Sequence, residues 1–101
     1  MAFIEEPKGY AKTILSDLQG GWSVLRQLVV EHAGFTDWDR MLFHIDEAMS
    51  WESVRNLTHM RNTLLIIRNL ALQNQVPDEI CQEIEDISDT LEEAMNIDKL
   101  R

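Results

Sequence analysis

Carboxylates are the side chains with the greatest capacity for chemistry in this chain, and they gather near its C-terminal end. Between Asp78 and Glu93 they recur at helical spacing in a nearly continuous row, whose chief members are Glu79, Glu83, Glu85, Asp86, Asp89, Glu92 and Glu93. Carboxylates three residues apart lie on one side of a helix, where a divalent cation can bind them. The segment 53–77, which should face this row, carries three arginines and no carboxylate. A metal-dependent hydrolase is therefore a distant alternative, and we expect no metal and no cofactor.

The same acidic row has two non-catalytic interpretations. It is either a solvated face that keeps a small protein soluble, or a docking surface for a basic protein partner. In its extreme form such a surface imitates nucleic acid and occupies the cleft of a DNA- or RNA-binding protein. Exposed aromatic residues often anchor interfaces. Phe43 lies off the apolar stripe of its helix, and Trp51 falls at the junction of the second and third helices. We predict that the seven carboxylates bind a partner together with Phe43 and Trp51.

Histidine and cysteine give no sign of a catalytic centre. No two of His32, His44 and His59 are spaced as zinc ligands, and His44 with Glu47 predicts a surface contact three residues apart. Cys81 is the single cysteine, which excludes a disulfide within the chain and favours a buried, unreactive thiol. Glycine-rich phosphate loops and nucleophile elbows do not occur in the sequence. We therefore expect a protein that is not an enzyme.

The charge distribution narrows the classes of partner. The 101 residues carry a net charge of -9, which repels nucleic acids and anionic membranes. Residues 53–77 are the exception, with a net charge of +3. The longest aliphatic run, residues 64–67, is too short to span a membrane, and the N-terminus lacks a signal-peptide pattern. These observations predict a cytoplasmic protein that binds neither nucleic acid nor membranes directly.

Composition and periodicity predict an all-α fold. Only 4 glycines and 2 prolines occur, while 45% of the residues are hydrophobic. We expect one domain, an antiparallel bundle of four helices over about 9–33, 37–49, 51–74 and 77–96. Residues 1–8 would form an N-terminal arm and residues 97–101 a C-terminal tail.

The first helix should run through a pair of glycines. Its apolar stripe keeps its phase across Gly20 and Gly21, and Gly34 is placed to end it. The stripe consists of Ala11, Leu15, Leu18, Trp22, Leu25 and Val29. The glycines are either a weak point or the place where another helix crosses closely.

The boundary between the second and third helices is ambiguous. Thr36 is a suitable N-cap for the second helix, and Ser50 for the third, with Met49 and Val54 as a hydrophobic staple. However, neither Gly nor Pro occurs between Phe35 and Val76, so helices two and three are possibly fused into one.

The last two helices have apolar seams that match in an antiparallel hairpin. In this hairpin each residue of helix three faces one residue of helix four, and the two residue numbers add to 151. Ala71 then meets Ile80, and Leu64 meets Ile87. This register places Arg68 opposite Glu83 and Arg61 near Asp89. We predict that both arginines form structural ion pairs with the acidic helix.

Helix three is also apolar outside this seam, at Leu65, Ile66, Leu70 and Leu72. A chain of this length has difficulty burying these residues together with its aromatic residues, and self-association would solve that problem. We therefore expect a homodimer, formed through helices one and two or through the outer side of helix three. The sequence thus predicts a small acidic interaction protein that regulates or inhibits a partner with a basic surface.

Overall fold

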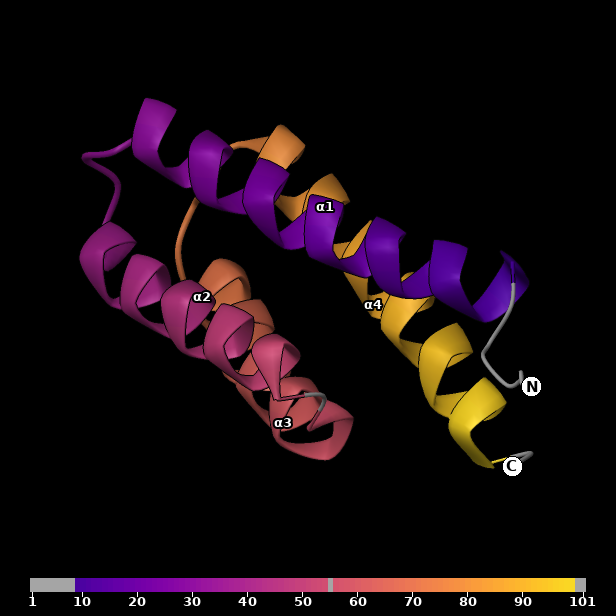
Figure 1. Cartoon of the computed structure of the whole chain (residues 1–101). Coiled ribbons are helices and arrows are strands. Elements are labelled where there is room, and N and C mark those ends of the chain that lie inside the picture. The colour runs from indigo at the N-terminus through magenta and orange to yellow at the C-terminus, as the bar shows by residue number, and fades with distance from the viewer. Residues whose placement is uncertain (1–8, 55, 100–101) are drawn as a thin grey trace.

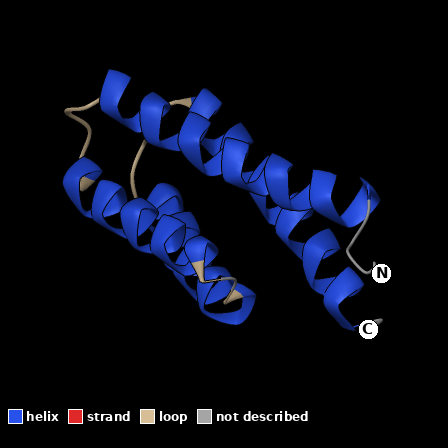
Figure 2. Cartoon of the chain, in the orientation of Figure 1, coloured by secondary structure: helices blue, strands red, loops and turns tan. Residues whose placement is uncertain are grey.

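Four helices joined by short turns make up the described chain. The structure is a computed structural model that describes residues 9–54 and 56–99. The helices are α1 (Gly9–Glu31), α2 (Trp38–Ser53), α3 (Leu57–Gln73) and α4 (Asp78–Lys99), and no strand occurs in the described ranges (Figures 1 and 2). The predicted N-terminal arm, residues 1–8, lies outside them.

The helices form an antiparallel bundle, as predicted. The largest contacts join α1 to α4 and α2 to α3, while α1–α2 and α3–α4 are the other two neighbouring pairs. In the described part of the chain, the diagonal pairs α1–α3 and α2–α4 meet only through side chains, because their backbones do not approach each other. Because α1 and α4 have 23 and 22 residues against 16 and 17 in α2 and α3, they extend beyond the connection between α2 and α3 (Figure 1).

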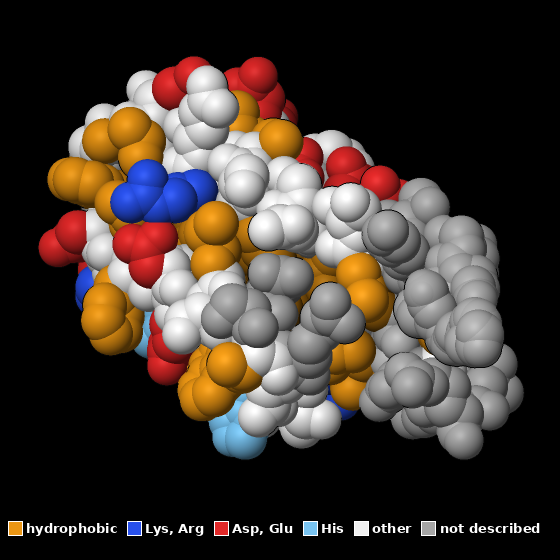
Figure 3. Space-filling view, in the orientation of Figure 1, with side chains coloured by type: hydrophobic (Ala, Val, Ile, Leu, Met, Phe, Trp, Pro, Cys, Tyr) orange, Lys and Arg blue, Asp and Glu red, His pale blue; other side chains and the backbone are white. Residues whose placement is uncertain are grey.

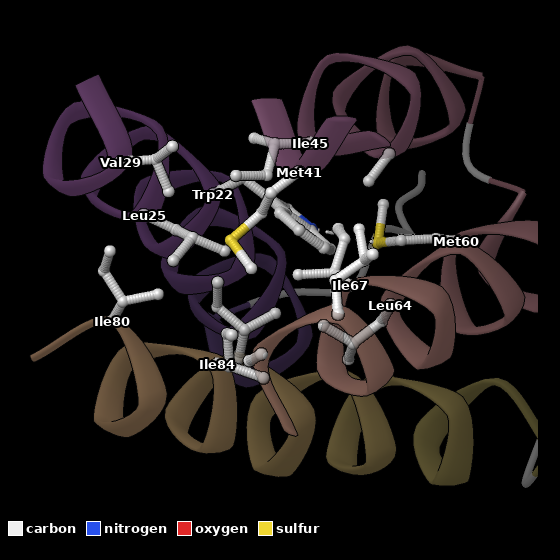
Figure 4. Packing of buried hydrophobic residues seen from close by; sticks show 14 of the residues in the cluster. Trp22, Leu25, Val29, Met41, Ile45, Met60, Leu64, Ile67, Ile80 and Ile84 are labelled. Atoms are coloured by element: carbon white, nitrogen blue, oxygen red, sulfur yellow. Dashed lines mark hydrogen bonds between the residues drawn. The ribbon is translucent and has the colours of Figure 1, made fainter. Parts of the chain in front are cut away.

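Side chains from all four helices meet in one core (Figure 4). Trp22 of α1 is fully buried at its centre, and its indole Nε1 donates a hydrogen bond to the Met60 sulfur of α3 at 3.2 Å. Met41 and Ile45 of α2 are equally inaccessible. The core contribution of α4 is Ile80, Ile84, Ile87 and Leu91.

Helix α1 continues through both glycines. On its buried face Ile14 takes the place expected for Leu15, which is only half-buried, while the side chain of Ala11 lies outside the described part. A Cβ built on Gly21 would stand 3.0 Å from Ile87 Cγ1, whereas one on Gly20 would meet nothing within 4 Å. Gly21 is therefore the site of a close helix crossing. Gly34, with φ of +118°, lies in the turn after α1.

Helices α2 and α3 are separate, but the break lies later than Ser50. α2 continues to Ser53, and Asn56 caps α3 because its side chain accepts a hydrogen bond from the His59 backbone N–H at 3.1 Å. Continuation of α2 lets Trp51 pack against the core. The proposed staple is absent, since Val54 follows the helix and is 64% exposed.

The other helix ends also differ slightly from expectation. α2 begins at Trp38, which is half-buried, and the Asp37 carbonyl accepts the Met41 N–H at 2.9 Å. The residue that immediately precedes α2 and accepts its first hydrogen bond is thus Asp37, with φ of 66°, and not Thr36. At the other end of the chain α4 extends to Lys99, so residues 97–99 belong to the helix and not to a tail.

Candidate protein-binding surface

The acidic residues of α4 lie on the side of the helix that faces away from the core. Ile84, Ile87 and Leu91 point inward at 1% exposure each. The exposed carboxylates are those of Asp78, Glu79, Glu85, Asp86, Asp89, Glu92 and Glu93. The amphipathic pattern of α4 therefore produces the continuous acidic surface expected from the sequence.

Two of these carboxylates bind neighbouring helices. Glu79 Oε1 lies 3.2 Å from His32 Nε2 at the end of α1, and His32 Nδ1 lies 2.9 Å from the Leu28 carbonyl oxygen. Glu85 Oε2 lies 3.1 Å from Arg68 Nε of α3. These contacts connect one flank of the acidic surface to α1 and the other to α3.

The middle of the acidic surface is different. Asp86 and Asp89 form no ion pair with any other described residue, and the Asp86 carboxylate accepts a hydrogen bond from Gln82 Nε2 at 3.0 Å. We call Asp86 and Asp89 the carboxylate edge.

Glu83 occupies a different position from the one predicted. Its Oε2 would lie 3.6 Å from a Cβ on Gly21, so it faces α1 and not Arg68. Burial, and to a smaller extent the charge of Asp86, raises the pKa of the Glu83 carboxyl above its usual range. Arg68 instead binds Glu85, so the residue numbers of this ion pair add to 153 and not to 151. The apolar spacings did not reveal this difference because they do not determine which flank of α4 faces α1 and which faces α3.

A small groove separates α3 from α4 next to this ion pair. Its volume is about 120 Å³, and it is lined by Arg61, Leu64, Leu65, Arg68, Ser88, Leu91, Glu92 and Met95. Ordinary ligand pockets hold about 300–1,000 Å³. The groove is therefore too small for a drug-sized molecule. Arg61 and Glu92, whose residue numbers also add to 153, both line it.

The two predicted aromatic anchors lie away from the acidic surface. Both belong to α2, whose backbone does not approach that of α4. Phe43 is 65% exposed, with its ring 5.2 Å from that of His44. Trp51 is half-buried against the core and stacks on His59 at 4.7 Å. The structure therefore does not bring the carboxylates and the aromatic anchors together on one face.

On the face formed by α1 and α2, the described hydrophobic side chains reach the surface in separate groups, with charged side chains among them (Figure 3). Arg26 Nε of α1 donates to Asp46 Oδ1 of α2 at 2.7 Å, and this contact raises the pKa of Arg26. Sequence spacing contained no signal for this pair, because it connects two helices whose relative rotation only the packing determines.

The remaining candidate groups show no metal site. Within the described ranges, no three His, Cys, Asp or Glu residues lie close enough to hold a metal ion. His44 Nδ1 lies 3.0 Å from Glu47 Oε1, which confirms the local contact predicted for this pair.

Cys81 is half-buried. Burial, followed by the charges of Asp78 and Glu85, raises the pKa of its thiol. A raised pKa lowers the fraction of reactive thiolate.

Two further findings concern the chain as a whole. None of the helices in the described ranges is long and apolar enough to cross a membrane. Comparison of the chain with protein-family models, with curated proteins and with solved structures finds no match.

Proposed function

We propose that this chain is a non-enzymatic interaction protein that regulates its partner by binding a basic surface of that partner through the carboxylate edge of α4. The observation that carries the proposal is the state of Asp86 and Asp89. Both are exposed, and neither forms an ion pair with another described residue. The bundle uses Glu79 and Glu85 to connect its helices, but it makes no such use of this pair.

The electrostatics of the edge favour a cationic partner. Like charges one helical turn apart destabilise a helix by about 0.2–0.5 kcal/mol per pair, and a basic surface would remove this repulsion. The net charge of -9 would attract such a partner at long range and accelerate association at low salt. Affinity for the partner should therefore fall as the salt concentration rises.

The test compares two double variants with the same change in charge. Asp86→Lys with Asp89→Lys reverses the carboxylate edge, while Asp17→Lys with Glu31→Lys reverses two exposed acids on α1. Each protein is immobilised and exposed to an extract of cells that produce the chain, and captured proteins are identified by mass spectrometry. The wild type and the α1 variant should capture the same basic protein, and the α4 variant should not. Equal capture by the α4 variant, or no capture by any of the three, would contradict the proposal.

Duplex DNA added as a competitor distinguishes two kinds of basic partner. If the captured protein is a nucleic-acid-binding protein whose cleft receives α4, DNA should displace it from the immobilised chain. If α4 binds a basic surface outside such a cleft, capture should persist at the same ionic strength. Retention in the presence of DNA would remove the interpretation of α4 as a nucleic-acid mimic.

A further inference from the structure

We propose that the α3–α4 face binds a second copy of this chain, with α3 of each copy packed on α4 of the other. The two-fold axis would run parallel to the helices. This inference goes beyond the proposed function because it uses the groove side of α4 and not the carboxylate edge. It rests on two complementary rows of side chains that flank the groove.

The row on α3 alternates arginine with leucine. Arg61, Leu65, Arg68 and Leu72 follow one another at spacings of four, three and four residues, which places them along one line of the helix. Leu65 is 46% exposed and Leu72 is 77% exposed. Neither belongs to the core of the chain. The row is therefore apolar enough to be buried and basic enough to require acidic neighbours.

The row on α4 supplies the opposite charge. Glu85, Ser88, Glu92 and Met95 are spaced by three, four and three residues. The last three line the groove, and Glu85 binds Arg68, which also lines it. The attraction between the rows is already present within one chain, where Arg68 Nε lies 3.1 Å from Glu85 Oε2. Arg61 and Glu92 line the groove without forming an ion pair with a described residue. They are the charges that a second copy would match.

Charge complementarity selects the symmetry. A two-fold axis parallel to the helices sets the basic row of each α3 against the acidic row of the other α4 and keeps these helices antiparallel. A perpendicular axis in the same plane would set arginine against arginine and glutamate against glutamate. The parallel axis also buries the exposed Leu65 and Leu72 of each α3 against the other copy.

The size of this face indicates a weak dimer. Helix α3 has 17 residues, or roughly 25 Å at 1.5 Å per residue, and two helices are about 20 Å wide. Each copy would bury roughly 500 Å², and the total of about 1,000 Å² is the lower limit for a specific interface. We therefore expect dissociation in the micromolar range.

A charge-swap experiment tests the proposal by sedimentation equilibrium of the full chain. Arg61→Glu and Glu92→Arg should each weaken the dimer by at least about tenfold, because like charges then meet at both symmetric contacts. An equimolar mixture of the two variants restores both contacts, so it should dimerise within about threefold of the wild type. A wild type that stays monomeric at millimolar concentration, or a mixture that fails to recover, would overturn the proposal.

A second pair of variants keeps the test decisive if a charge reversal unfolds the chain, which circular dichroism would reveal. Leu65→Gln removes an apolar contact from the groove, and Val24→Gln makes a similar change on α1, where the valine is 48% exposed. Only Leu65→Gln should weaken the dimer, and equal effects of the two changes would overturn the proposal. The Asp86→Lys, Asp89→Lys variant should dimerise like the wild type even if it loses its partner, so the two proposals fail separately.

Discussion

Gly21 of α1 lies directly against the side chain of Ile87 of α4. A Cβ on Gly21 would lie 3.0 Å from Ile87 Cγ1, a distance that real Cβ atoms scarcely show. Ile87 is 1% exposed and is surrounded by the core. A glycine at this position therefore allows the longest pair of helices to pack together.

Substitution of the two glycines should have opposite effects. Gly21→Ala should lower the free energy of unfolding by about 1 kcal/mol, because Ile87 must shift within a packed core and this costs more than the better helix propensity of alanine provides. Gly20→Ala, with open space around the new methyl group, should raise it by about 0.5–1 kcal/mol. Urea unfolding measures both. An equal gain from the two substitutions would show that the crossing tolerates a side chain.

The contact between Trp22 and Met60 should make Met60 less replaceable than Met41. Met60→Leu nearly preserves the volume but removes the only hydrogen-bond acceptor described for the buried Trp22 N–H. We expect it to cost about 1–2 kcal/mol more than Met41→Leu, because the unsatisfied indole N–H stays buried. Thermal unfolding of the two variants gives the difference. In a chain that already carries Trp22→Phe, the indole N–H is absent. Met60→Leu should then cost no more free energy of unfolding than Met41→Leu does.

Asn56 should be the residue that separates α2 from α3. Asn56→Ala removes the cap on the His59 N–H and should lower the free energy of unfolding by about 1 kcal/mol. Asn62→Ala, at an exposed position inside α3, should instead be neutral or slightly stabilising, because alanine is the better helix former. Equal effects of the two changes in urea would mean that Asn56 does not act as a cap.

The half-buried Glu83 should make stability depend on pH. Its pKa is raised in the folded chain, so the folded state holds the proton more tightly than the unfolded state does. The charged form thus destabilises the fold above the raised pKa, and stability falls as the pH rises from the ordinary glutamate pKa to the raised one.

Glu83→Gln should remove this penalty. It should raise the melting temperature at pH 7, and the gain should vanish near about pH 3.5, where the wild-type carboxyl is protonated in both states. Asp17→Asn, at an exposed site on α1, provides the control. A gain from Glu83→Gln that is the same at both pH values would have a cause other than ionisation.

The periodicity of apolar residues alone was enough to identify the architecture. It predicted four helices, an unbroken α1 and the inward residues of α4, because an amphipathic helix can bury only one face whatever it packs against. The positions of the helix ends were predicted less accurately. The break after α2 depends on Asn56 and on the packing of Trp51, and several residues there are suitable caps.

The rotation and register of the helices were decided only by the tertiary structure. The sequence predicted that Arg61 and Arg68 face an acidic helix, but in the structure Glu83 faces Gly21 and Arg68 binds Glu85. The structure also separates Phe43 and Trp51 from the acidic surface, because α2 and α4 lie on a diagonal of the bundle. A pattern along one helix reveals which face is buried, whereas the identity of the neighbour depends on how all four helices fill the core together.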